Sequence, residues 1–87
     1  MYRVVLTESA RRFYECADGP LQRKLDRCFT LMSQEPRFHP NVKRLKARLK
    51  GYWRYRVGDY RVVYRIDEGQ RLVILVLITH RKDVYRK

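Results

Sequence analysis

The residues of this chain that could do chemistry are mainly arginines, placed where polar and apolar residues alternate with a period of two. Four of them occupy alternate positions in two neighbouring segments: Arg54, Arg56, Arg61 and Arg65. The Gly58-Asp59 pair between the segments is typical of a two-residue type II′ turn that joins antiparallel strands. That turn places Arg56 directly opposite Arg61, and strand alternation then predicts all four arginines on one face of a sheet.

Two arginines that face each other across a sheet form an unfavourable pair. Directly opposed side chains have Cβ atoms about 5 Å apart, and like charges at that distance destabilise the fold. An anion bound between Arg56 and Arg61 would relieve the repulsion, and guanidinium groups suit bidentate binding of phosphate. A charged strand face that simply contacts water is the alternative interpretation.

An apolar run at residues 72–78 follows the hairpin and predicts a third strand whose end returns to the turn. We therefore expect His80 and Arg81 to emerge beside the facing arginines, with Tyr85 within reach. An imidazole can accept and donate a proton near neutral pH, and an aromatic ring can stack on an unpaired base. The structural alternatives are a surface histidine at a strand end and a frayed terminal tyrosine.

Fixed cations, an imidazole and an aromatic ring together suit cleavage of RNA without a metal. The 2′-hydroxyl attacks the adjacent phosphate in line, which yields a 2′,3′-cyclic phosphate and a 5′-hydroxyl. Arg54, Arg56 and Arg61 would stabilise the extra negative charge, and His80 would transfer a proton. DNA has no 2′-hydroxyl and would not be cut. The nine acidic residues, two cysteines and two histidines form no metal-binding motif, so we expect no metal ion and no cofactor.

Lysine and arginine total 21 against 9 aspartates and glutamates, a net charge of +12. Residues 1–41 hold seven bases and five acids, whereas residues 42–87 hold fourteen bases and four acids. Such asymmetry attracts polyanions, and nucleic acid is the first candidate. The longest apolar run has seven residues, far short of the ~20 that a membrane span needs. The cysteine spacing and the lack of a signal-peptide core predict a cytoplasmic location.

Hydrophobic periodicity predicts the elements that position these residues. Apolar residues at helical spacing indicate two helices, at about 10–17 and 21–32, separated by Asp18-Gly19-Pro20. Thr7 or Ser9 would cap the first helix. Runs with a period of two, or fully apolar runs, predict strands at 2–6, 53–57, 60–66 and 72–78.

These elements predict a single domain over residues 1–87, of the α+β class and in the order β-α-α-β-β-β. A two-helix hairpin would pack on a mainly antiparallel four-stranded sheet, with the aromatic residues of the strands in the core. Residues 42–50 fit either a helical turn or an extended connector. The helix pair can also be interpreted as a DNA-binding helix-turn-helix, but its basic residues are balanced by acidic residues.

Three segments of the chain together resemble one family of bacterial and archaeal proteins. They are LKARLKG at 45–51, WRYRVGDYRVVY at 53–64 and HRKDVY at 80–85. In this combination they are similar to the RelE branch of the RelE/ParE toxin superfamily, and the resemblance covers essentially the whole chain. It implies a RelE-like fold and a type II toxin–antitoxin system toxin that cuts mRNA in the ribosomal A site. The implied partners are the ribosome with its mRNA and an acidic, RelB-like antitoxin.

The resemblance also implies roles for individual residues. Arg61 matches the phosphate-binding arginine, Arg81 the proposed general acid and Tyr85 the base-stacking tyrosine. His80 stands where some relatives place a catalytic histidine. Further cations are expected to bind RNA around this set: Lys46, Lys50, Arg65 and Lys82.

Arg54 and Arg56 match two basic residues that are lysines in well-known members, where one of them is the proposed general base. An arginine holds its proton and is a poor base. That role would then fall to His80, Lys46 or Lys50, or catalysis would be mainly electrostatic. Two other functions stay open: a ParE-like inhibitor of DNA gyrase without nuclease activity, and an RNA- or ribosome-binding module without turnover.

Overall fold

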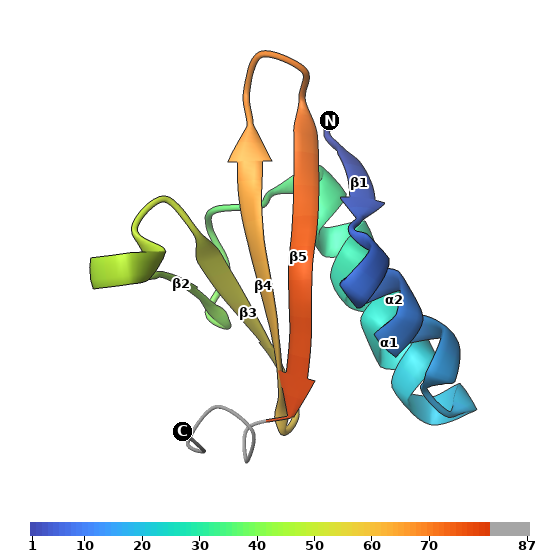
Figure 1. The fold of residues 1–87 in the computed structure, drawn as a ribbon. Coiled ribbons are helices and arrows are strands. Elements are labelled where there is room, and N and C mark those ends of the chain that lie inside the picture. Colours follow the sequence, from blue (N-terminus) through green and yellow to red (C-terminus); the bar gives the residue numbers. More distant parts are fainter. Residues whose placement is uncertain (81–87) are drawn as a thin grey trace.

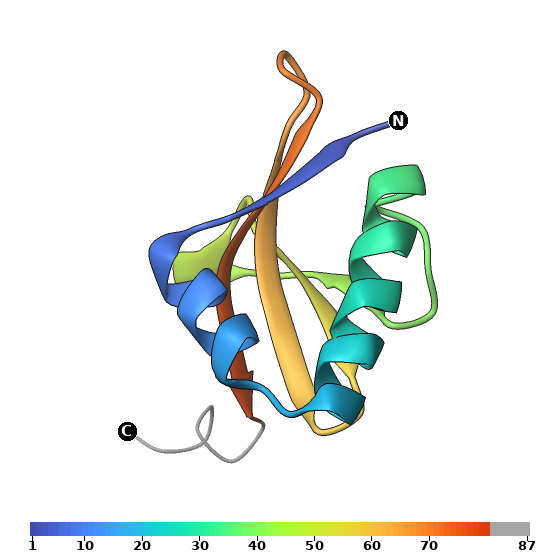
Figure 2. The same ribbon diagram turned by 90° about the vertical axis from the view of Figure 1, so that its right-hand side faces the viewer.

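The structure, a computed structural model, describes residues 1–80, which form a single mixed sheet and two α-helices (Figure 1). The strands are β1 (Arg3–Leu6), β2 (Val42–Arg44), β3 (Trp53–Val57), β4 (Tyr60–Asp67) and β5 (Leu72–His80). The helices are α1 (Glu8–Cys16), α2 (Gly19–Gln34) and the single 3-10 turn η1 (Ala47–Leu49). The strand order is β1-β5-β4-β3-β2, and both α-helices lie on one face of the sheet (Figure 2).

Local sequence signals set the starts of both helices. Thr7 caps α1, because its side chain accepts a hydrogen bond from the Ala10 backbone N–H at 3.4 Å. Asp18 caps α2 in the same way, through a backbone N–H at 2.9 Å. Pro20 lies in the first turn of α2, where a missing N–H leaves no helical hydrogen bond unmade. The predicted helix pair is confirmed, and Thr7 rather than Ser9 begins it.

The sheet contains one strand more than the sequence predicted. Strands β3, β4 and β5 form an antiparallel meander, and β1 pairs in parallel with β5 at one edge. At the other edge β2 pairs antiparallel with β3. The α+β class and the helix pair on a mainly antiparallel sheet are confirmed. Residues 42–50 contain both structures that the sequence left open, since the extended β2 precedes the helical turn η1.

The core lies between the sheet and the two helices. From α2 it includes Leu25, Cys28 and Met32, each at most 2% exposed. The sheet residues that are fully inaccessible to solvent are Val62, Tyr64, Val73 and Leu75. The Tyr64 hydroxyl donates a hydrogen bond to the Pro36 carbonyl at 2.6 Å, so this buried phenol is paired.

Two aromatic residues of the strands, Trp53 and Tyr60, depart from their predicted core positions, since both are only partly buried. Trp53 is only partly buried and packs at the margin of the core. Its ring lies under the Arg44 guanidinium, whose carbon is 5.4 Å from the ring centroid. The ring is therefore shared between the core and a cationic side chain of the edge strand.

A bulge in β5 changes which of its residues face the helices. Val63 pairs with Leu77, whereas the next residue of β4 pairs with Leu75, so Val76 is an extra residue in the ladder. Before the bulge, odd-numbered residues of β5 are buried. After it, Ile78 is buried and Leu77 is 41% exposed. The bulge thus exchanges the faces toward which the last residues of β5 point.

Candidate functional site

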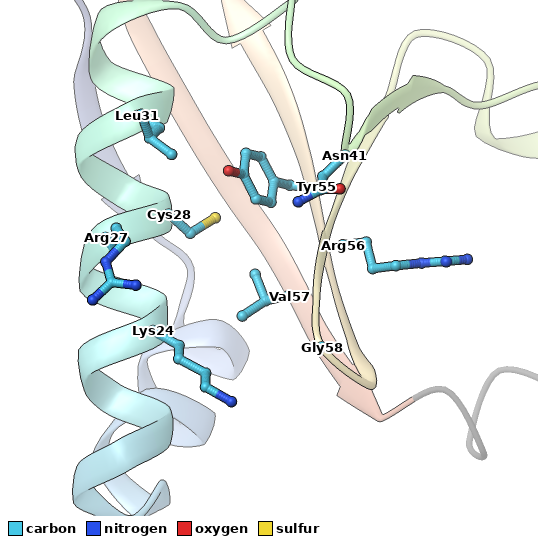
Figure 3. A pocket seen from close by; sticks show the side chains of 9 residues that line it. All are labelled: Lys24, Arg27, Cys28, Leu31, Asn41, Tyr55, Arg56, Val57 and Gly58. Atoms are coloured by element: carbon cyan, nitrogen blue, oxygen red, sulfur yellow. The ribbon is translucent and has the colours of Figure 1, made fainter.

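The β3–β4 hairpin has the predicted register, and two arginines face each other on it. Arg56 pairs with Arg61, and Arg54 pairs with Val63. Gly58 has a φ of +57°, which the first central position of a type II′ turn requires. The helices cover the opposite face of the sheet (Figure 2), and the Arg56 side chain points away from α2 (Figure 3). The set Arg54, Arg56 and Arg61 is termed the arginine face.

Arg54 is held by the chain segment that precedes β2. Its guanidinium donates a hydrogen bond to the Asn41 carbonyl at 3.1 Å, and the Arg56 backbone N–H donates to the same oxygen at 3.0 Å. Burial lowers the pKa of Arg54, and the charges of Arg56 and Arg61 lower it further. The three guanidinium groups are therefore close enough to repel one another, and a bound anion would be favourable there.

Two further residues flank the arginine face on the neighbouring strands. Lys43 of β2 pairs with Arg54, and Thr79 of β5 pairs with Arg61. The cationic surface therefore continues across β2, and a hydroxyl borders it on the other side. Sequence reasoning missed Lys43 as a site residue, because the basic run after residue 42 does not show which of its members joins the sheet.

Arg65 lies on the outer side of β4 but apart from the arginine face. It is exposed, and it follows Arg61 by four residues along the same strand. At ~3.3 Å per residue the two positions are about 13 Å apart. Arg65 is therefore too far from Arg61 to bind the same small anion, and its expected contact with RNA stays a prediction.

His80 does not lie beside the arginine face, contrary to expectation. It pairs with Tyr60, and the two rings meet edge to face with their centroids 4.9 Å apart. Tyr60 belongs to the face that the helices cover, where its ring also meets Phe13 of α1 at 5.7 Å. The bulge in β5 explains the difference, because without it the even-numbered residues of β5, including His80, would point to the same side of the sheet as Arg61.

Two of the other predicted residues lie outside the sheet. Lys46 and Lys50 flank η1 and are exposed. Arg81, Lys82 and Tyr85 are outside the described residues, so their roles stay predictions.

His39 supports the arginine face from the loop before β2, and sequence reasoning also missed it. Its Nδ1 accepts a hydrogen bond from the Asn41 backbone N–H at 3.1 Å. Its ring stacks on the Tyr55 ring with centroids 5.0 Å apart, and its Nε2 lies 3.4 Å from the Tyr55 hydroxyl. A core tyrosine thus holds, through His39, the loop whose carbonyl positions Arg54.

A groove opens on the other side of β3, between that strand and α2 (Figure 3). Its volume is about 240 Å³, and its lining residues are Lys24, Arg27, Cys28, Leu31, Asn41, Tyr55, Arg56, Val57 and Gly58. The Cys28 sulfur and the Tyr55 and Val57 side chains point into it (Figure 3). Burial raises the pKa of the Cys28 thiol to about 12, so a nucleophilic thiolate does not form at neutral pH. The groove therefore offers no nucleophile at neutral pH, and the arginine face is the stronger candidate for the functional site.

Two other kinds of feature are missing from residues 1–80. No three His, Cys, Asp or Glu side chains in that part of the chain gather where they could hold a metal ion. None of its helices has the length and apolar character to cross a bilayer.

Comparison with known proteins identifies the family. The profile of the family described as "ParE toxin of type II toxin-antitoxin system, parDE" matches residues 6–85. Toxin RelG of Mycobacterium tuberculosis is 33% identical over 87 residues, which cover 99% of this chain and 98% of the relative. The chain belongs to the RelE/ParE toxin superfamily.

Solved structures of RelE/ParE toxins share this fold. The toxin–antitoxin complex RelBE2 from Mycobacterium tuberculosis matches with a TM-score of 0.79 and 30% identity, covering 92% of this chain and 98% of that one. The archaeal RelE–RelB complex from Pyrococcus horikoshii matches with a TM-score of 0.79 and 21% identity, covering 92% and 94%. The RelE-like fold predicted from sequence is confirmed, and the protein is a type II toxin–antitoxin system toxin of the RelE/ParE family.

Proposed function

We propose that this toxin is a RelE-type mRNA interferase, a metal-independent endoribonuclease that cuts mRNA in the ribosomal A site. The observation that carries the proposal is the arginine face. Arg54, Arg56 and Arg61 are gathered on one open side of the sheet by the register of a single hairpin. Fixed guanidinium groups of this kind stabilise the negative charge that develops on a phosphate during cleavage.

The reaction forms and breaks one bond at phosphorus. The 2′-oxygen bonds to phosphorus as the bond to the 5′-oxygen breaks, which yields a 2′,3′-cyclic phosphate and a 5′-hydroxyl. Arg56 and Arg61 bind the non-bridging oxygens from two adjacent strands, and Arg54 adds positive charge beside them. One proton leaves the 2′-hydroxyl and one reaches the 5′-oxygen.

The arginines of the arginine face are poorly suited to carry out these proton transfers. Arginine holds its proton at neutral pH, so Arg54 and Arg56 are poor bases where well-known members of the family have lysines. His80 contacts Tyr60 on the helix-covered face, which argues against its assignment as proton donor. We assign that role to Arg81 and base stacking to Tyr85, as the resemblance implies. Catalysis is then mainly electrostatic, with the 2′-proton passing to solvent.

Dependence on the ribosome follows from the shape of the arginine face. It lies on the side of the sheet that α1 and α2 leave uncovered (Figure 1). In-line attack needs a fixed orientation of the RNA, and such orientation supplies about 7–11 kcal/mol in favourable cases. A ribosome that holds the message in its A site would provide the orientation that the protein does not.

The proposed partner of the toxin in the cell is an acidic, RelB-like antitoxin. The net charge of +12 favours an acidic partner. The relatives from Mycobacterium tuberculosis and Pyrococcus horikoshii were solved as complexes with antitoxins. Ribosome, message and antitoxin together place this toxin in the cytoplasm.

Primer extension on a translated mRNA, after induction of the toxin, tests the proposal. We expect new 5′ ends only inside translated codons, and their loss in Arg61→Ala. Arg23→Ala, an exposed arginine of α2, is the matched control and should cut like the unaltered toxin. Ribosomes that bind the toxin without any cut in the message would contradict the proposal and favour a non-catalytic binding module.

A ParE-like inhibitor of DNA gyrase is the second candidate. The family profile that matches the chain carries the ParE name, which favours it. That function needs no convergence of cations on a phosphate, and it predicts broken DNA with intact mRNA. The same induced cells, probed for double-strand breaks in DNA, distinguish the two functions.

A further inference from the structure

The bulge in β5 turns one leucine outward, onto the side of the sheet that carries the arginine face. Leu77 is 41% exposed, and within the strands that the structure describes it is the one large apolar side chain that is exposed. An unbroken strand would continue the pattern of the buried Val73 and Leu75 and would place Leu77 in the core.

The bulge that exposes Leu77 is held by the rest of the fold. Val76 is the extra residue of the ladder, and its carbonyl accepts a hydrogen bond from the Thr7 hydroxyl at 3.1 Å. The same Thr7 side chain caps α1. Bulges are common next to active sites, where they re-aim a side chain. The outward position of Leu77 is therefore set by the architecture of the sheet and the start of α1.

The register places Leu77 beside the arginine face. Leu77 pairs with Val63, and Val63 pairs with Arg54, so these three residues form one row on the same side of the sheet. Val63 is partly buried. From strand geometry, its backbone lies about 5 Å from that of Arg54 and about 7 Å from that of Arg61. The side chains of Leu77 and Val63 are termed the apolar ledge.

An apolar surface next to fixed cations suits a ligand that joins an anionic group to an apolar face. An unpaired nucleotide has this composition, because its phosphate is charged and the face of its base is apolar. An acidic amphipathic helix also combines the two, but it presents three or four apolar residues in every two turns. One exposed leucine beside a partly buried valine is a small surface for such a helix, and its size favours a single base.

We propose that the apolar ledge binds the face of an unpaired RNA base while the neighbouring phosphates bind the arginine face. This inference rests on the proposed function, since it assigns a base subsite to the same substrate. The ledge is additional to the base stacking proposed for Tyr85. Contact with the face of a base leaves its hydrogen-bonding edges unread, so the ledge tolerates every base.

Leu77→Thr tests the ledge, because threonine suits a strand and offers less apolar surface. Binding is measured with two probes: a short unstructured 2′-O-methyl RNA, which cannot be cut, and the same chain without its bases. The original protein should bind the RNA that has bases more tightly. Leu77→Thr should lower the ratio of the two affinities by roughly three- to tenfold. Its affinity for the chain without bases, and the slope of log K against log salt, should not change, because no phosphate contact is lost.

Three further variants serve as references. Leu77→Phe should raise the ratio of the two affinities, because an aromatic ring stacks on a base, and a misfolded protein would not show this gain. Phe38→Ser removes a side chain that is 78% exposed on the loop after α2, and it should keep the original ratio. Arg61→Ala should weaken the binding of both probes together, since it removes a phosphate contact.

Two kinds of result overturn the proposal. The first is a ratio of affinities that Leu77→Thr leaves unchanged, or a loss that is equal with both probes. The second is a Leu77→Thr toxin that binds both probes normally but no longer binds its acidic antitoxin, because the ledge would then be a protein contact.

The uncut probes keep this result separate from the proposed function. A preference for bases that Leu77→Thr reduces supports the ledge even in a toxin that never cuts a translated message. Conversely, a toxin that cuts the message and shows no change of ratio in Leu77→Thr contradicts the ledge and leaves the nuclease function standing.

Discussion

Arg56 stands opposite Arg61 because the two-residue turn at Gly58 fixes the hairpin register. In the free protein this arrangement brings like charges together, and the charges of Arg56 and Arg61 add to the effect of burial in lowering the pKa of Arg54. Folded proteins depart from favourable local pairing mainly at functional sites. At the scale of single residues, the arginine face is therefore expected to serve binding and catalysis more than stability.

Arg56→Ala should separate these two roles. Removal of one charge from an opposed pair is expected to leave the free energy of unfolding within about 0.5 kcal/mol of the original, or to raise it slightly. Single-turnover cleavage on programmed ribosomes should fall by roughly 10² to 10³, the usual effect of losing one transition-state donor. Urea unfolding and the cleavage assay measure the two effects. A variant that is strongly destabilised and still cleaves would make the arginine face structural.

His80→Gln should have a small effect on cleavage. The imidazole meets the Tyr60 ring on the helix-covered face, at a centroid distance of 4.9 Å. The expected decrease in rate is well short of the roughly 10²–10⁴-fold loss that removal of a general acid causes. The same single-turnover assay measures it, with Arg61→Ala as the inactive reference. A rate in His80→Gln as low as in Arg61→Ala would restore His80 as the proton donor.

The secondary-structure elements differ in how much of their geometry the sequence reveals. The β3–β4 register was predictable, because a Gly-Asp turn and alternating residues leave a single pairing. The bulge in β5 was not, because residues 72–78 are all apolar and carry no signal of which side faces the core. The three-residue strand β2 is too short for periodicity to reveal.

The residues of the candidate site also differ in how well the sequence predicts their positions. Arg54, Arg56 and Arg61 were placed correctly because they belong to the hairpin with a readable register. His80 was misplaced because its face depends on the bulge. The support that His39 gives to the loop before β2 was not foreseeable, because the contact with Tyr55 joins residues that only the fold brings together.

The backbone conformation at the start of η1 can be tested at Ala47, which has a φ of +57°. The left-handed conformation costs a non-glycine residue about 1–2 kcal/mol, more than the roughly 0.5–1 kcal/mol of chain entropy that glycine loses on folding. Ala47→Gly should therefore leave the protein as stable as before, or raise its unfolding free energy by up to about 1 kcal/mol.

Ala47→Val should lower the unfolding free energy, because a β-branched residue fits a positive φ poorly. Urea unfolding measures both variants. Equal stability of the alanine, glycine and valine forms would show that residue 47 is not held in this conformation in solution.

At the scale of the whole molecule, one polar cluster joins three segments that lie far apart in the sequence. The Tyr2 hydroxyl donates to the Glu68 carboxylate at 2.8 Å, and Arg37 donates to the Tyr2 hydroxyl at 3.1 Å and pairs with Glu68. The Arg71 guanidinium carbon lies 4.4 Å from the centroid of the Tyr2 ring. The cluster links the N-terminal segment, the loop after α2 and the β4–β5 turn.

Protonation of Glu68 should loosen this cluster. The hydrogen bond from Tyr2 and the pairing with Arg37 lower the pKa of Glu68 below its ordinary value of 4.5. A lowered carboxylate pKa stabilises the fold above pH 4.5, and that contribution is lost as the pH falls through the folded-state pKa. Glu68→Gln should therefore unfold more easily than the original protein near pH 7, and the difference should shrink toward pH 3.

Urea unfolding at several pH values measures this difference. Glu35→Gln, which removes an exposed carboxylate elsewhere, is the control and should match the original protein. A difference between the original protein and Glu68→Gln that stays constant down to pH 3 would exclude the carboxylate as its source.

The parallel pairing of β1 with β5 has a consequence for the synthesis of the toxin. Arg3 pairs with Leu72, so the first strand has no partner until nearly the whole chain exists. Translation proceeds at about 5–20 residues per second, and β1 must therefore wait roughly 3 to 14 seconds. Strand β5, the partner that β1 needs, also borders the arginine face. The sheet of a newly made toxin thus closes only once β5 has been synthesised, and the arginine face is not complete before then.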